Sequence, residues 1–272
     1  MSKIYIMGDV HGSFKPIREF YNSWIEKPEE GDVLILLGDF GGNFYLDDRD
    51  DTFKKKLARY GFTYFVIRGN HEQRPSILYQ TNPNDWHLEE FFNGSVYVEN
   101  KYPYIKYAAD MPFQYNIDGY CVLTIPGAYS VDKYYRLKMG WHWYDSEQLT
   151  EDEMNIGRMM VKACPKWDLV LSHTCPVIDE PTDLFLRQID QSMVDKTMER
   201  YLGELENQME YTLWAWGHYH ATRIYPRFSE DKVFLKDRIM LFGYKVLDLN
   251  KYWDTKNLHD SLITFEIPFW FL

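Results

Sequence analysis

Six short apolar runs limit what this chain can fold into more than any other feature of its sequence. Each run is rich in Ile, Val, Leu, Tyr and Phe, is too short for a helix, and is followed by turn-forming residues, as is typical of buried strands. The runs cover residues 3–7, 33–37, 63–67, 121–125, 169–171 and 213–216. Recurring buried strands predict that a β-sheet forms the centre of the fold.

Segments with helical spacing separate several of these runs. In residues 14–24, 51–60, 151–164 and 188–206, apolar side chains recur at helical spacing against charged ones. The order strand, helix, strand predicts a largely parallel core, whereas residues 222–269 alternate more like antiparallel strands. The sequence therefore predicts an α/β fold in which a pair of mixed sheets is covered by helices.

The chain shows no internal repeat, no low-complexity tract and no linker rich in Gly, Ser or Pro. We therefore expect one domain over residues 1–272. Residues 73–119 are rich in Tyr, Phe, Asn and Pro but have no sustained period. We expect this segment to be insertion and cap material.

Composition argues against several classes of function. The formal net charge of −11 repels polyanions, so general binding to nucleic acid is not expected. The three cysteines lack the spacing of a disulfide framework or of a thiolate zinc site. No apolar run has the length of a signal peptide or a membrane span, so we expect a soluble, cytoplasmic protein without membrane association.

Five of the six runs end in a block that offers carboxylate, amide or imidazole groups. The blocks are GDVHG at 8–12, GDFGGN at 38–43, GNHE at 69–72, SHTCP at 172–176 and GHYH at 217–220. Because the carboxyl ends of parallel strands meet at one edge of a sheet, we expect these groups to converge in space. Their glycines allow the sharp turns and close approach that such a site needs.

Converging aspartates and imidazoles would destabilise the protein if nothing lay between them. Like-charge repulsion and desolvation would cost several kcal/mol, and bound cations remove that cost. Oxygen and nitrogen ligands without thiolate suit Mn, Fe, Zn, Co or Ni, and about seven or eight donors are too many for one ion but suit two. The sequence predicts two divalent metal ions, with Mn the ion expected to serve in vitro.

The five blocks, in this order and over residues 8–220, resemble the signature blocks of the calcineurin-like metallophosphoesterases. The resemblance implies a two-sheet sandwich flanked by helices, with two metals bridged by the aspartate of the second block. It implies that Asp9, His11, Asp39 and His220 hold one metal, and that Asp39, Asn70, His173 and His218 hold the other.

The resemblance also implies the chemistry. A hydroxide that bridges the metals would attack the phosphorus of a phosphate ester. Asp39, which would bridge the same two metals, is therefore expected to be essential to catalysis together with His71. His71 matches the family histidine that is not a ligand and that protonates the leaving oxygen. The expected partner is a phosphate-ester substrate, and no protein partner is predicted.

Departures from two branches of the family leave the substrate open. Protein serine/threonine phosphatases have an Asp-Arg pair where this chain has Gly42 and Asn43, so another group must orient His71. The lariat-RNA debranching branch has cysteine at the position of Asp9. Two alternatives to this function remain. One is a phosphodiesterase that acts on nucleotides or nucleic acid, and the other is a non-catalytic scaffold that binds a protein. Intact ligand blocks favour an enzyme over a scaffold.

Four residues are candidates for binding the substrate. Arg136 and Lys133 follow the fourth run and should lie at the edge of the sheet that carries the ligands, although basic loops commonly face water. Arg74 lies just past the GNHE block. Asn43 either contacts the substrate or caps a turn.

Overall fold

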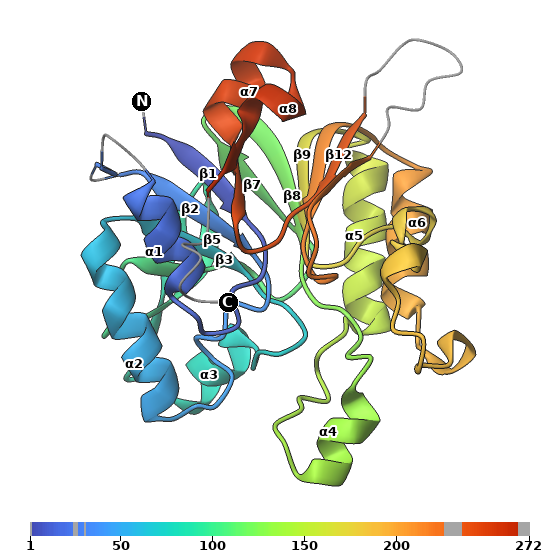
Figure 1. The fold of residues 1–272 in the computed structure, drawn as a ribbon, viewed down its shortest axis with the longest axis horizontal. Helices are drawn as coiled ribbons and strands as arrows, with labels where there is room; N and C mark the ends of the chain where they lie inside the picture. The colour runs from blue at the N-terminus through green and yellow to red at the C-terminus, as the bar shows by residue number, and fades with distance from the viewer. Residues whose placement is uncertain (1, 24–26, 30, 226–235, 266–272) are drawn as a thin grey trace.

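The computed structural model describes residues 2–23, 27–29, 31–225 and 236–265. These residues form two mixed β-sheets that pack face to face, with helices on their outer faces (Figure 1). The prediction of an α/β fold with two sheets flanked by helices is confirmed.

The first sheet is parallel at its centre and antiparallel at its edges. It contains β1 (Ile4–Met7), β2 (Val33–Leu37), β3 (Thr63–Ile67), β4 (Trp86–Phe91), β5 (Gly94–Glu99), β6 (Ile105–Tyr107), β13 (Lys245–Asp248) and β14 (Leu262–Thr264). Within the described residues their order is β14-β13-β1-β2-β3-β6-β5-β4. Strands β1, β2, β3 and β6 are parallel to one another.

The second sheet has the same plan. It contains β7 (Phe113–Ile117), β8 (Tyr120–Ile125), β9 (Lys166–Ser172), β10 (Glu210–Trp216), β11 (Arg223–Tyr225) and β12 (Asp237–Met240). In the part of the chain that the structure describes, their order is β11-β12-β10-β9-β8-β7. Strands β8, β9, β10 and β12 are parallel, and β7 and β11 are antiparallel edges.

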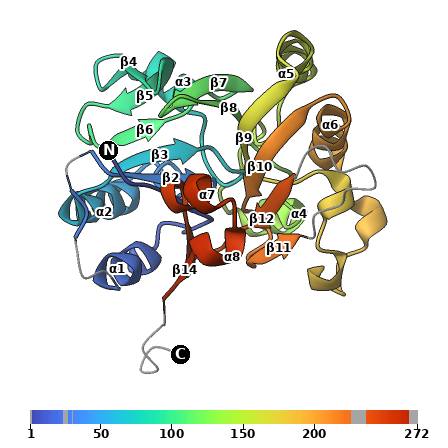
Figure 2. The same cartoon turned by 90° about the horizontal axis from the view of Figure 1, so that it is seen from above.

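Helices cover the outer face of each sheet (Figure 2). The described helices are α1 (Lys15–Asn22), α2 (Asp48–Leu57), α3 (Pro75–Thr81), α4 (Lys133–Met139), α5 (Glu151–Ala163), α6 (Thr197–Glu206), α7 (Leu249–Thr255) and α8 (Leu258–Ser261). Helices α7 and α8 contribute to the core between the sheets at one end, and α4 projects at the opposite end (Figure 1). Helices α1 and α2 pack on the first sheet, and α5 and α6 pack on the second. Helix α5 begins with a capping box, in which the side chains of Thr150 and Glu153 each accept a backbone N–H of the other residue.

Burial on both faces explains why the central strands are continuous apolar runs. In β2, Ile35 and Leu37 face the core between the two sheets, while Leu34 and Leu36 face the core beneath the helices. A parallel strand covered on both sides needs apolar residues at successive positions rather than at alternate ones. The six runs identified in the sequence all form strands, and β8, β9 and β10 begin earlier than the runs that predicted them.

Two expected elements differ from the structure. Helix α6 begins at Thr197, so the predicted helix over 188–206 is wrong in its first half, where Asp190 and Asp195 accept backbone N–H groups at turns instead. Residues 222–265 include α7 and α8 as well as strands, and β12 runs parallel to β10. The remainder of the predicted antiparallel region, at 226–235 and 266–269, lies outside the described residues.

Residues 73–119 were expected to form insertion and cap material, but they lie in the body of the fold. It forms α3 and the strands β4, β5, β6 and β7, which extend both sheets at their edges. These edge strands mix aromatic and polar residues, so apolar and polar positions do not alternate regularly along them. The pattern used to predict strands from the sequence is therefore absent in this segment. None of the described helices combines the length and the apolar character needed to cross a bilayer, and the three cysteines form no disulfide.

Candidate metal centre

Loops at the carboxyl ends of five parallel strands bring the predicted ligands together between the two sheets. Asp9 and His11 follow β1, Asp39 follows β2, Asn70 follows β3, His173 follows β9, and His218 and His220 follow β10. The convergence that was expected from the topology is therefore present. It joins residues from both sheets at one site.

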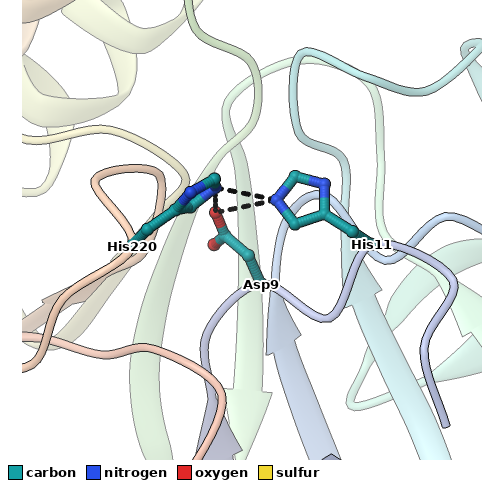
Figure 3. A group of neighbouring side chains, drawn as sticks. All are labelled: Asp9, His11 and His220. Atoms are coloured by element: carbon teal, nitrogen blue, oxygen red, sulfur yellow. Dashed lines mark hydrogen bonds and ion pairs between the residues drawn. The ribbon is translucent and has the colours of Figure 1, made fainter. Parts of the chain in front are cut away.

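The first group of ligands is Asp9, His11 and His220. Figure 3 shows the two imidazole rings on either side of the carboxylate, reaching it from separate loops. Asp9 Oδ2 lies 3.6 Å from His220 Nε2 and 3.9 Å from His11 Nε2, and the two Nε2 atoms are 2.8 Å apart. One ligand atom of each residue falls within 4.8 Å of the others, which is a suitable spacing for one cation.

Asp39 lies between this group and a second one. Its Oδ2 is 3.9 Å from His11 Nε2, and its Oδ1 is 3.6 Å from His173 Nε2. His173 Nε2 is in turn 2.8 Å from Asn70 Oδ1. One oxygen of the Asp39 carboxylate therefore lies near the first group of ligands, and the other oxygen lies near the second group.

The hydrogen bonds of His173 favour a cation beside its ring. Its Nδ1 lies 2.7 Å from the Leu37 carbonyl oxygen, which can only accept, so Nδ1 carries the proton. Burial lowers the pKa of His173 and keeps the ring neutral, although Asp39 opposes this effect. The lone pair of Nε2 then faces Asn70 Oδ1, because the Asn70 amide donates to Ser130 Oγ. Two buried acceptors in contact are unfavourable, and a cation between them satisfies both.

The two aspartates are in opposite electrostatic situations. Both are buried, and Asp9 has its pKa raised well above the ordinary value by burial and then by the charge of Asp39. Burial also acts to raise the pKa of Asp39, but His71, His173 and His11 outweigh it and hold this pKa well below the ordinary value. Positive charge at the site would allow both carboxylates to ionise, so the donor set suits divalent cations.

The backbone at the site is strained. His11, Asp39, His218 and His220 have φ angles of 48°, 46°, 71° and 52°, in the left-handed region that side-chain-bearing residues rarely adopt. Such conformations cost on the order of 1–3 kcal/mol each and persist where the surrounding structure imposes them. The ligand loops are therefore held in place by the fold.

Two glycines permit the close approach of ligand side chains. A Cβ at Gly38 would lie 2.1 Å from His173 Nδ1, and a Cβ at Gly69 would lie 2.1 Å from Asp39 Oδ1. No side chain fits at either position while the ligand stays where it is. The role assigned to these glycines from the sequence agrees with this geometry.

Gly38→Ala is expected to abolish the rise in melting temperature that Mn²⁺ gives the wild-type protein, because the new Cβ displaces the His173 ring. Gly119→Ala is the matched control, since its φ of +91° is close to the +92° of Gly38 and its Cβ would meet no described atom within 4 Å. Thermal unfolding with and without Mn²⁺ compares the two variants. An undiminished Mn²⁺ effect in Gly38→Ala contradicts the placement of His173 at an ion site.

His71 points at the same centre and is in contact with Arg136. His71 Nε2 lies 3.9 Å from Asp39 Oδ2, and Arg136 Nη2 lies 2.9 Å from His71 Nδ1 and 3.2 Å from its Nε2. A guanidinium can only donate, so the nearer Nδ1 accepts and the proton of the neutral ring is on Nε2. Asp132 holds Arg136 through a 2.7 Å bond to Nε, and Phe44 stacks on the His71 ring.

Of the four candidate substrate-binding residues, Arg136 lies in the cleft over the site. The described lining of that cleft does not include Arg74, Lys133 or Asn43. Arg74 is buried and bonded to Glu153 and to two backbone carbonyls, and the Lys133 ammonium lies 4.2 Å from the centre of the Trp143 ring. Asn43 is buried beside the Tyr107 hydroxyl. All three side chains thus have contacts within the protein, outside the described lining of the cleft.

The cleft has a volume of about 740 Å³ and includes residues that sequence reasoning missed. One wall comes from residues 180–199, which follow β9 and run into the first turn of α6, and includes Glu180, Phe185 and Glu199. Tyr219 also lines the cleft, and its place between two ligand histidines was a signal for it in the sequence. Nothing local in the sequence marks Glu199, which lies within a segment read as an ordinary amphipathic helix.

Comparisons with known proteins agree with this geometry. A family model described as Calcineurin-like phosphoesterase matches residues 2–222. No curated protein gives a significant match.

Among solved structures, the chain is similar at 12% identity to the phosphopantetheinyl hydrolase PptH from Mycobacterium tuberculosis, with a TM-score of 0.45 and coverage of 100% of this chain and 98% of that one. It is also similar at 12% identity to TT1561 of Thermus thermophilus, with a TM-score of 0.48 and coverage of 92% and 95%. A third solved structure is 12% identical over 97% of this chain and 99% of that one, with a TM-score of 0.56. This third likeness supports the fold alone.

Proposed function

Because this chain belongs to the calcineurin-like phosphoesterase family, we propose that it is a metal-dependent enzyme that hydrolyses phosphate esters. The observation that carries this proposal is the meeting of carboxylate, amide and imidazole groups from five loops around Asp39. Each of the ligand blocks that the family requires is intact in the sequence.

Two divalent cations are the expected cofactors. Asp9, His11, Asp39 and His220 would hold one, and Asp39, Asn70, His173 and His218 would hold the other. When bound, they would neutralise the phosphoryl oxygens and lower the pKa of the water that attacks phosphorus. Mn²⁺ is the ion with which we expect activity in vitro, and the nitrogen and oxygen donors also suit Fe, Zn, Co and Ni.

His71 is the proposed general acid. Its Nε2 carries the proton in the tautomer that Arg136 selects, and this atom lies on the same side of Asp39 as His11. When the bond between phosphorus and the ester oxygen breaks, the leaving oxygen takes the proton from Nε2 of the charged ring, which carries a proton on each nitrogen. The ring is left neutral with its proton on Nδ1, so the contact between Arg136 and Nδ1 has to open during this step. Burial lowers the pKa of His71, which makes the charged form a strong proton donor.

Arg136 is proposed as the residue that positions His71. Its three guanidinium nitrogens contact Asp132, the His142 carbonyl oxygen and His71, so each nitrogen already has a partner within the protein. The Asp132 and Arg136 pair would then replace the aspartate that orients the equivalent histidine in protein serine/threonine phosphatases.

Arg136→Lys is expected to lower kcat by about tenfold or more while KM changes by about twofold or less, because an ammonium group cannot hold Asp132 and His71 together. Arg158→Lys is the control, since Arg158 pairs with Glu204 outside the cleft. Steady-state kinetics with an aryl phosphate separate the two parameters. A rise confined to KM would show instead that Arg136 binds the phosphoryl group.

The charged residues that line the cleft favour an enzyme for small phosphate esters over a phosphodiesterase that acts on nucleic acid. Among its described lining residues, Asp39, Asp132, Glu180, Asp195 and Glu199 carry carboxylates, while Arg136 is the one arginine or lysine. Such a wall repels a polyanion. Hydrolysis of p-nitrophenyl phosphate and of bis-p-nitrophenyl phosphate with added Mn²⁺ compares monoester and diester activity. A protein that hydrolyses neither and binds no metal would be a scaffold with this fold.

A further inference from the structure

Glu199 places a carboxylate without a full set of partners in the wall of the cleft. It is 4% exposed and lies in the first turn of α6. Its Oε1 accepts the Thr174 hydroxyl at 2.7 Å, whereas its Oε2 is buried and has no hydrogen-bond partner among the described residues. Burial raises the pKa of Glu199 to about 7, against the Thr174 bond and a contact with its own backbone N–H. A buried acceptor without a donor is unfavourable unless a ligand supplies one.

Contacts through Thr174 and Tyr219 link Glu199 to the metal centre. Thr174 directly follows His173, and its Oγ1 also lies 3.1 Å from the Tyr219 hydroxyl. Tyr219 lies between His218 and His220, and both Glu199 and Tyr219 line the cleft that contains the metal centre. A small molecule in this cleft can therefore contact the centre and Glu199 together.

The wall around Glu199 has the character of a site for an organic cation. Leu184, Leu186 and Val194 give it an apolar surface, and the Phe185 and Tyr219 rings are stacked 6.2 Å apart. The neighbouring Glu180 is already paired with Lys196 at 2.7 Å, and the Lys196 ammonium lies 4.9 Å from the centre of the Phe185 ring. Glu199 lines the same wall; Lys196 acts on it through its charge, and no described cation forms a hydrogen bond with its Oε2.

We propose that this wall is a leaving-group subsite for an ammonium group, so that the preferred substrates are phosphate esters of amino alcohols. The reaction in this inference rests on the proposed function, but the subsite does not. The phosphoryl group would lie at the metal centre, the carbon chain on the apolar wall, and the ammonium group at Glu199 Oε2. Leaving groups that carry further phosphates would be disfavoured, because they would face Asp195 and Glu199.

The test compares two non-hydrolysable ligands of equal size, 5-aminopentylphosphonate and hexylphosphonate, by calorimetry on the Mn²⁺-loaded protein. The wild-type protein is expected to bind the amino ligand about tenfold more tightly, since a buried carboxylate gains a charged donor. Glu199→Gln is expected to bind both ligands equally, and its remaining oxygen can still accept the Thr174 hydroxyl. Glu204→Gln is the matched control, with the same change on the same helix outside the cleft, and should keep the preference.

Equal binding of the two ligands by the wild-type protein, or an undiminished preference in Glu199→Gln, overturns the inference. Hydrolysis of p-nitrophenyl phosphate by the same preparations separates it from the proposed function. A protein that hydrolyses this ester but shows no Glu199-dependent preference retains the function and loses the subsite. An inactive protein that shows the preference retains the subsite and loses the proposed function.

Discussion

Asp39→Asn is expected to lose most of its bound Mn²⁺ and to lower kcat/KM for an aryl phosphate by more than about a hundredfold. Loss of an outer partner of a metal ligand typically costs about 10–100-fold, and Asp39 is proposed as a direct ligand of both ions. The asparagine keeps the size of the side chain but removes the negative charge between the two groups of ligands. Metal analysis after dialysis and steady-state kinetics measure the two effects.

Asp237→Asn is the control for this experiment. Asp237 is also a buried aspartate, but it lies at the start of β12 and accepts the Tyr252 hydroxyl at 2.8 Å, outside the cleft. Its replacement should leave the bound Mn²⁺ unchanged, whatever it does to stability. If Asp39→Asn retains its metal and activity as Asp237→Asn does, the carboxylate of Asp39 is not shared between two ions.

His71→Ala is expected to retain its metal but to lower kcat by about a hundredfold to ten-thousandfold, the usual contribution of general acid catalysis. The loss should be greater for an alkyl phosphate than for p-nitrophenyl phosphate, because an alkoxide needs a proton to leave and a nitrophenolate needs it far less. Kinetics on the two esters, with metal analysis of each preparation, test both statements.

His142→Ala controls for the loss of packing, since the ring centres of His71 and His142 lie 6.0 Å and 5.8 Å from that of Phe44. The described lining of the cleft does not include His142, so this variant should keep its activity. An equal loss for both esters in His71→Ala would contradict a role in protonating the leaving oxygen. Loss of metal from that variant would make His71 a ligand instead.

The sequence contained enough information to predict the architecture and the meeting of the ligand blocks. Runs such as those of β2 and β3 are buried on both faces and end in turn residues, so their local pattern is clear. Once the core is parallel, topology places Asp9, Asp39 and Asn70 at one edge without any knowledge of long-range contacts. The fold class and the family could therefore be predicted from the sequence.

The sequence did not determine which charged side chains face the cleft. Arg74 and Arg136 looked alike as candidate clamps, yet Glu153 holds the first within the protein and the second reaches His71. The choice depends on where α4 and α5 pack, which local periodicity does not report. The wall that contains Glu199 was missed for the same reason, since residues 180–196 form short turns that a reading by period treats as helix or loop.

Diffraction from crystals of the Mn²⁺-loaded protein, with anomalous data collected near the manganese absorption edge, tests the central claim most directly. We predict two anomalous peaks, one beside Asp9, His11 and His220 and the other beside Asn70, His173 and His218, with an oxygen of Asp39 coordinating each ion. Two ions without Asp39 as a ligand, a single ion, or ions bound elsewhere would contradict the account.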